Sequence, residues 1–470
     1  MAKINTMMDI GKRSMMNSQT ALQTVAHNIA NKTTEGFSRQ RVDQVTAVPV
    51  SEGRLQLGTG ARAAQVTRTT NPAIDRQLQL ETGKMGFEDA HAESMARVEQ
   101  VFNEQQNKGI NQYMSDFFNG WRELANNPES LTIRTLVKES AEALIGDFKR
   151  VHDQLTDVQK DIDTQVGMHV GEINKMSAEI ADLNDKITQV EIQGNPANDQ
   201  RDRRELLLKK LNEKIDIKVA EGDHGAVSVS TAGNCLLVSG LDHRELRTMK
   251  DGNSDRTQVY FKESNDGAPF VITGRIKSGA LGGVLSIRDS LIEDLHDNVD
   301  ELASSIVDGV NAAHVEGLDR KSRPGVNFFE IKEGTTRISS GLKLSDEISN
   351  DVGRIAAAAH DKSPGDNTVA HVVANLQYKE IMDDGTSTID DFYASNIGQV
   401  GVLAQKANKA RETQGAVVQQ MNTLRESVSG VSLDEETVKM VEHQKAFEAS
   451  ARVIRTADEM FDTVMNLKRI

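Results

Sequence analysis

Residues 58–64, GTGARAA, have the types and spacing of a phosphate-binding loop of the GxGxxA kind. Such a loop binds phosphate only when a helix follows directly, because the helix N-terminus then faces the anion. The sequence that follows, QVTRTTNP, has no helical pattern. We therefore interpret GTGARAA as a turn between two strands.

A second stretch, DGNSDRTQVYFKE, begins like a calcium loop, with Asp251, Asn253 and Asp255 at alternate positions. Its sixth position is Arg256 where calcium loops have glycine, and its twelfth is Lys262 where they have glutamate. We expect no calcium site here. The eleven histidines are scattered and no HExxH motif occurs, so we expect no metal site, no cofactor site and no catalytic site, and we interpret the protein as no enzyme.

The other reactive residue types have structural explanations. Cys235, in the apolar stretch NCLLVSG, is the one cysteine; we expect a small buried side chain and no internal disulfide. We interpret His314 and His443 as core or helix-surface residues rather than ligands. The charge-dense residues 199–210, DQRDRRELLLKK, are expected to form salt bridges along the start of a helix.

The composition is typical of long amphipathic helices with thin apolar stripes, since 37% of the 470 residues are hydrophobic and only 4% aromatic. The net charge of −15 disfavours a protein that binds nucleic acid or anionic lipid. No apolar run approaches the roughly 20 residues that a membrane span requires. The N-terminal MAKINTMMDIGKRSMM lacks the apolar core of a cleavable secretory signal. We expect no membrane insertion and no cleaved signal.

Heptad spacing of apolar residues predicts a long helix at each end of the chain. One heptad position of the N-terminal helix is filled by Met8, Met15, Leu22 and Ile29, and its partner position by Ile4, Gly11, Ser18 and Val25. The C-terminal helix has Leu433, Met440, Phe447, Ile454 and Phe461 at one position and Ser450, Ala457 and Val464 at the other. A helix with so thin an apolar stripe gains little free energy by folding alone. We expect a coiled coil of residues 1–36 with 430–470, which either only closes the chain or also packs against neighbouring copies.

Between these helices the pattern predicts a helical bundle with a β-rich insertion. Residues 37–71 are expected to form a spacer or hairpin, and residues 72–214 and 281–429 two parts of the bundle, with a possible hairpin near 318–350. Residues 215–280 contain short strand-like runs separated by Gly, Asp, Asn and Ser. The fold class is thus mainly α with an inserted small β domain. We expect a nested rod with both chain ends at one end and the insertion at the other.

The joint after the N-terminal helix has the sequence HNIANKTTEGFSRQRV. Asn28 and Asn31 can satisfy backbone or neighbouring polar groups where the helix ends. Gly36 permits a left-handed turn, and Phe37 can anchor that turn by burial. We expect Arg39 to pair with acidic neighbours in an assembled stack.

The stretch NIANKTTEGFSRQRV resembles the N-terminal signature of the axial proteins of the bacterial flagellum, which are the rod, hook and hook-associated proteins. The continuation Ser38-Arg39-Gln40 is similar to the hook-associated protein 1 family. Three further stretches resemble that family: GNPANDQRDRRELLLKKLNEKIDIKV, the helix that ends in NAAHVEG, and SGVSLDEETVKMVEHQKAFEASARVIRTADEMFDTVMNL.

The resemblance implies a structural adaptor that assembles as a ring at the junction between hook and filament and is required for filament growth. Its implied partners are further copies of the chain, the hook protein and a second junction protein. It also implies localisation to the flagellum outside the cell after export through the flagellar type III apparatus. A cytoplasmic chaperone is implied to hold the C-terminal helix beforehand.

Two alternatives remain open from the sequence. The first is a rod or hook protein of the same axial family. The second is a secreted hydrolase or adhesin with a site in residues 215–350. The β-rich insertion has only about 60 residues, so we expect the additional outer domain found in many members of the family to be absent or reduced.

The residues expected to form the assembly interface are Met8, Met15, Leu22, Asn28, Ile29, Asn31, Gly36, Phe37, Arg39, Met440, Phe447, Ile454, Phe461 and Val464.

Overall fold

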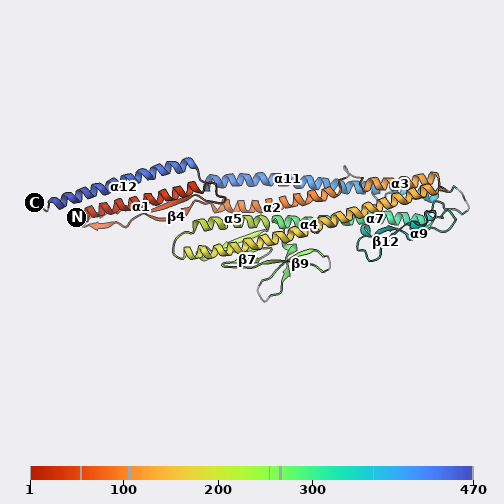
Figure 1. Cartoon of the computed structure of the whole chain (residues 1–470), viewed down its shortest axis with the longest axis horizontal. Coiled ribbons are helices and arrows are strands. Elements are labelled where there is room, and N and C mark those ends of the chain that lie inside the picture. Colours follow the sequence, from red (N-terminus) through yellow and green to blue (C-terminus); the bar gives the residue numbers. More distant parts are fainter. Residues whose placement is uncertain are drawn as a thin grey trace.

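The computed structural model describes residues 2–52, 55–103, 108–252, 255–263, 267–361, 363 and 365–467. The chain forms an elongated rod whose long helices run along its axis, and both chain ends lie at the same end of the rod (Figure 1). A mainly helical fold with small antiparallel sheets inserted in the middle of the chain confirms the predicted fold class.

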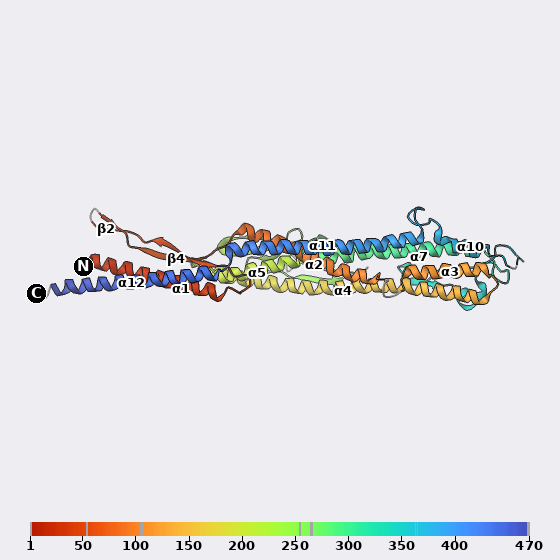
Figure 2. The ribbon, with the colours of Figure 1, turned by 90° about the horizontal axis from the view of Figure 1, so that it is seen from above.

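The end of the rod that carries both termini consists of two helices and a β-hairpin (Figures 1 and 2). The helices are α1 (Ala2–Ala30) and α12 (Leu433–Leu467), which pack against each other. The hairpin strands are β1 (Gln40–Thr46), β2 (Val50–Glu52), β3 (Leu55–Leu57) and β4 (Ala61–Arg68), paired β1 with β4 and β2 with β3. Helix α1 ends at Ala30, six residues before Gly36, because a hydrogen-bonded turn takes over at Asn31.

The rod body is a bundle of long helices. These are α2 (Pro72–Val101), α3 (Ile110–Asn126), α4 (Leu131–Glu191), α5 (Asn198–Lys214), α6 (Gly279–Ser286), α7 (Ile292–Val315) and α11 (Ile389–Ser429). A π-helical turn, Ile287–Leu291, joins α6 to α7. Asn71 and Ser130 cap α2 and α4 through side-chain oxygens that accept backbone N–H groups. Helix α4 spans 61 residues and is the longest helix of the body.

The β-rich insertion forms two antiparallel sheets, as the strand-like runs predicted. One sheet has the order β5 (Ile217–Glu221), β6 (Val227–Thr231), β7 (Cys235–Ser239) and β8 (Asp242–His243). The other has the order β11 (Phe270–Val271), β10 (Thr257–Phe261) and β9 (Leu246–Lys250). Cys235 is buried in this domain.

The insertion lies beside the middle of the rod and not at its far end, which corrects the expectation from sequence (Figure 1). The physical reason is the fold of α5, which packs back along the last third of α4. Its final residue, Lys214, pairs with Glu172, and β5 begins beside that part of α4. Asn184 and Asn174 of α4 then hold the sheets, since their amides donate to the carbonyl oxygens of Val227 and Leu246, each at 2.8 Å.

Residues 316–388 were expected to continue the bundle, with a possible hairpin near 318–350. They form the far end of the rod from loops and short elements, and the antiparallel strand pair lies within 318–350. The short elements are β12 (Phe329–Ile331), α8 (Ile338–Gly341), β13 (Leu342–Leu344), α9 (Asp346–Asn350) and α10 (Thr368–Asn375). Strands β12 and β13 pair antiparallel. Short 3-10 turns occur at Asp223–Gly225, Thr273–Arg275, Val352–Arg354 and Leu376–Tyr378.

The NAAHVEG segment organises these loops. The side-chain oxygen of Asn311 accepts the N–H groups of Phe328 and Phe329 at 2.8 and 2.9 Å. His314 is fully buried, donates from Nδ1 to the carbonyl of Val326 at 2.5 Å, and accepts the N–H of Ala356 at Nε2 at 2.7 Å. Burial lowers the pKa of His314 to about 4. His314 is therefore a neutral core residue, as the sequence indicated.

Within the described residues, no helix is long and apolar enough to cross a membrane.

Candidate assembly site at the terminal helix pair

Small residues line the seam between α1 and α12 and let the two helices approach closely. A Cβ on Gly11 would lie 2.7 Å from Cγ1 of Ile454, so any larger residue would push the helices apart. One helical turn further, Ser450 Oγ donates to Ser14 Oγ at 2.7 Å. Because the paired positions rise in α1 as they fall in α12, the two helices are antiparallel. Gly11, Ser18, Val25, Ser450 and Ala457 are buried.

The large residues of the predicted stripes are only partly covered by this pairing. Those that are half-buried are Met8, Met15, Leu22, Ile29, Met440, Phe447, Ile454 and Phe461. Val464 is 40% exposed. The structure therefore brings the two predicted stripes together within one chain, but two helices alone do not enclose them.

The opposite face of α12 also carries apolar side chains. Val438 and Val441 are 68% and 56% exposed. Two residues turn an α-helix by about 200°, so Val438 points away from the side on which Glu436 accepts a hydrogen bond from Asn28 of α1. The sequence analysis missed this face because its residues fall outside the heptad stripe.

A buried polar cluster ties the terminal pair together at its inner end. Asn28 exchanges two hydrogen bonds with the backbone of Gln40, at 2.8 and 2.9 Å, and donates to Glu436 Oε2 at 2.9 Å. Arg39 Nε donates to Glu436 Oε1 at 2.9 Å, and its Nη1 lies 2.9 Å from Glu435. Asn28 and Glu436 are both buried. The acidic partners of Arg39 in the single chain are thus its own Glu435 and Glu436. Pairing of Arg39 with a neighbouring copy stays a prediction.

The same joint is fixed to the rod body by the start of α5. Asp202 accepts the backbone N–H of Ser38 and a guanidinium N–H of Arg68, both at 2.8 Å. Arg68 also pairs with Glu205, and Gln40 donates to Asp199 at 2.7 Å. Burial raises the pKa of Asp202, while the Arg68 guanidinium acts in the opposite direction. We had expected this charge-dense segment to form salt bridges along its own helix. Instead, Asp199, Asp202 and Glu205 bind residues of the joint.

The turn between α1 and β1 has the conformation that its residues predict. Gly36 is left-handed, with φ of +83°, and a Cβ there would lie 3.0 Å from Cβ of Leu206. The ring of Phe37 packs edge-on against His27 with centroids 5.5 Å apart. Asn31 donates to the carbonyl of His27 at 3.1 Å.

Sequence reasoning missed Glu436, Asp202 and Arg68, which hold the joint. Acidic residues cluster at the starts of α5 and α12, and basic residues cluster near the hairpin. That clustering was the available signal, but it does not reveal which charges pair.

The GTGARAA motif forms a turn and the start of a strand. Residues 58–60 lie between β3 and β4, Gly60 turns the chain with φ of +85°, and ARAA begins β4, which confirms the predicted turn between strands. Asn253 of the calcium-like loop lies outside the described residues. Among the residues that are described, no group of three or more His, Cys, Asp or Glu side chains is placed to hold a metal ion.

Comparison with known proteins identifies the family. Residues 95–329, half of the chain, match the family model described as the flagellar hook-associated protein FlgK helical domain. The chain belongs to the FlgK family. Residues 425–467 also match the model for the C-terminal part of flagellar basal body rod FlgEFG proteins. The whole of α12 therefore lies in a segment that is similar to the C-terminal part of these rod proteins.

Relatives with similar sequences extend over nearly the whole chain. The flagellar hook-associated protein 1 of Bacillus subtilis (strain 168) is 28% identical, over 98% of this chain and 97% of that protein. The Escherichia coli (strain K12) protein of the same name is 24% identical, over 96% and 97%. These matches confirm the resemblance inferred from the sequence, and the protein is a structural component of the bacterial flagellum.

A solved structure shares the fold. The flagellar hook junction protein FlgK from Burkholderia pseudomallei matches with a TM-score of 0.67 at 15% identity, over 75% of this chain and 100% of that one.

Proposed function

We propose that the protein is a non-enzymatic junction adaptor, assembled as a ring between hook and filament through its terminal helix pair, and needed for filament growth. The observation that supports this most is the apolar face of α12 at Val438 and Val441, which faces away from α1 and is largely exposed in one chain. Apolar side chains at this exposure gain free energy when a neighbouring copy covers them.

The geometry of the pair suits repeated packing around a tube. In the described residues α1 packs against α12 and the hairpin strands β1 and β4, and no third long helix covers the pair. The half-buried stripe residues and the exposed face are therefore available to copies on either side. In this arrangement the interface includes the predicted residues, but Asn28, Gly36 and Arg39 act within each chain by holding the joint.

The proposed partners follow from the position of the ring between the hook and the filament. The terminal pair of each copy contacts other copies in the ring, the ring meets the hook protein on one side, and a second junction protein binds on the other. Before export through the type III apparatus, a cytoplasmic chaperone covers α12, whose exposed apolar residues fit helix-in-groove recognition.

The alternatives have less support. A rod or hook protein would explain the match of residues 425–467, but not the FlgK helical domain over residues 95–329. For a hydrolase or adhesin, the described parts of residues 215–350 offer no cluster of side chains able to hold a metal ion, and the relatives reported above are all hook-associated proteins.

The test is a double substitution on the outer face, Val438→Asp with Val441→Asp. These side chains are exposed in the single chain, so the folded monomer should be unaffected, while buried charges should block the interface between copies. The expected phenotype is hooks without filaments and filament subunits shed into the medium. Glu442→Ala, an exposed change on the same helix, is the matched control and should leave filaments normal.

Normal filaments in the double variant, at wild-type levels of exported protein, would show that this face is not the interface.

A further inference from the structure

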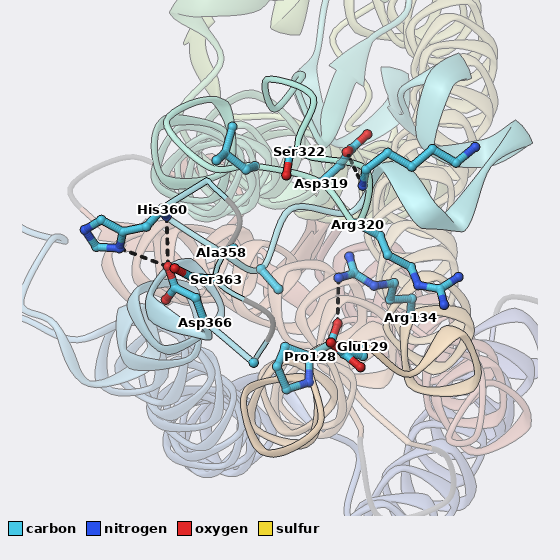
Figure 3. A pocket seen from close by; sticks show the side chains of 14 residues that line it. Pro128, Glu129, Arg134, Asp319, Arg320, Ser322, Ala358, His360, Ser363 and Asp366 are labelled. Carbon is cyan, nitrogen blue, oxygen red and sulfur yellow. Dashed lines mark hydrogen bonds and ion pairs between the residues drawn. The ribbon is translucent and has the colours of Figure 1, made fainter.

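A cavity of about 370 Å³ opens at the end of the rod opposite the terminal pair (Figures 1 and 3). Its wall combines Pro128 just before α4, Arg134 from the first turn of α4, Asp319 and Arg320 from the loop after α7, and the residues His360, Ser363, Gly365 and Asp366. None of the residues proposed for assembly lines it. The cavity is therefore a feature that the junction role does not explain.

Arg134 is the unusual group in this wall. The side chain is only 2% exposed, and its guanidinium donates from Nη2 to the carbonyl of Pro128 at 2.7 Å. Its Nε and Nη1 have no hydrogen-bond partner in the described part of the chain. Buried donors without acceptors are costly and rare in native structures, so each requires an explanation.

The position of Arg134 in α4 adds to that cost. Arg134 lies in the first turn of this helix, where the helix dipole disfavours a cation and favours an anion. Arg320 is a second arginine among the residues that line the cavity (Figure 3). Burial and the charge of Arg320 lower the pKa of Arg134 to about 10. A buried guanidinium with unpaired donors and a helix N-terminus thus meet at one cavity, whose lining also includes the exposed Arg320.

The acidic groups of the cavity are already engaged elsewhere. Asp319 pairs with Arg323 at 2.6 Å and with Arg354 at 2.8 Å. Asp366 accepts the backbone N–H groups of Ala359, His360 and Thr368 at 2.8–3.0 Å.

One acidic side chain of the cavity, Glu129, is not engaged in this way. Glu129 is an exposed carboxylate at the rim that has no ion pair in the described part of the chain. The wall carries three cations, Arg134, Arg320 and Lys321, and three carboxylates, Glu129, Asp319 and Asp366. Because Asp319 and Asp366 are held by other groups, Glu129 is the carboxylate left to compete with a bound anion.

We propose that this cavity binds an oxyanion, the carboxylate or phosphate group of a small molecule. The guanidinium groups of Arg134 and Arg320 hold its oxygens, because guanidinium N–H groups match both oxyanions in geometry and charge. The N-terminus of α4 adds a favourable dipole. Glu129 is the internal competitor at the rim. The cavity is larger than a single phosphate, so it also accommodates the body of the molecule that carries the anion.

Isothermal titration of the full chain tests this, with inorganic phosphate and glutarate as probes and with sodium chloride holding the ionic strength constant. Saturable one-to-one binding of at least one probe is expected, and the tighter probe assigns the phosphate or the carboxylate class. Arg320→Gln should weaken binding about tenfold, since it removes a charged donor. Glu129→Gln should strengthen binding, because it removes the competing charge. Arg203→Gln, which changes an exposed arginine of α5 outside the cavity, is the matched control and should have no effect.

Absence of saturable binding of both probes in the wild-type chain and in Glu129→Gln would overturn the proposal. Binding that Arg320→Gln leaves unchanged would overturn it as well. Because Arg320 and Glu129 are exposed, neither substitution is expected to impair folding, and junction assembly is expected to be normal in both variants.

Discussion

The rod body and the terminal helix pair are both helical, but they bury their side chains to very different extents. At the far end of the body Phe117, Trp121 and Phe328 are fully buried and their rings pack against one another. In the terminal pair Phe447 and Phe461 are only half-buried. From this difference we expect the body to fold by itself and the terminal pair to reach full burial only in an assembly.

The two regions also differ in what holds them in place. The body relies on apolar contacts along α4, but the terminal pair is connected to it through the buried polar joint of Asn28, Arg39 and Glu436. Buried ion pairs contribute little net stability, yet breaking one leaves a charge without compensation. The joint therefore sets the direction of the pair relative to the body more than it stabilises the chain.

The largest expected effect is on the body. Phe117→Ala should lower the free energy of unfolding of the monomer by about 3–5 kcal/mol, because it leaves a cavity in a fully enclosed aromatic cluster. Denaturation by urea, followed by circular dichroism, measures this. Phe447→Ala is the comparison variant, and its effect on the monomer should be clearly smaller because Phe447 is half-buried. Equal losses would remove the distinction between the two regions.

The second effect concerns pH, because acid should destabilise the body. Burial lowers the pKa values of His314 and His296 from 6.5 to about 4. Between these values the unfolded chain binds more protons than the folded chain, so stability is lost as the pH falls from about 6.5 to 4. The loss should reach up to about 3 kcal/mol for each histidine. Urea titrations at pH 7, 5.5 and 4.5 measure the slope, and a free energy of unfolding that stays constant over this range would contradict the assignment.

A smaller effect is expected at the joint. Glu436→Ala should weaken the docking of α12 by about 1–3 kcal/mol, since it leaves Asn28 and Arg39 without their shared acceptor. Faster proteolytic cleavage within α12 of the monomer is the readout. Glu435→Ala is the matched control: this neighbouring carboxylate also pairs with Arg39 but is 60% exposed, so its loss should be nearly neutral. Equal rates of cleavage within α12 in the two variants would argue against a role of burial at the joint.

Local patterns predicted much of this arrangement. The heptad spacing around Met15 and Phe447 indicated both terminal helices and their pairing, and Gly36 indicated the left-handed turn. The pairing of Arg39 with Glu436 joins residues 397 positions apart, and no local rule selects that partner among so many carboxylates. The predicted position of the β-rich insertion was wrong. That position depends on how α5 folds back along α4, and the periodicity of apolar residues does not encode this packing.

The central claim is that the terminal pair gains its stability from assembly while the body does not need it. Hydrogen–deuterium exchange of the full chain, as dilute monomer and within isolated hook–filament junctions, tests this most directly. The account predicts that the amides of α1 and α12 exchange much faster than those of α4 and α7 in the monomer and become protected in the junction. Equal protection of both regions in the monomer, unchanged on assembly, would contradict it.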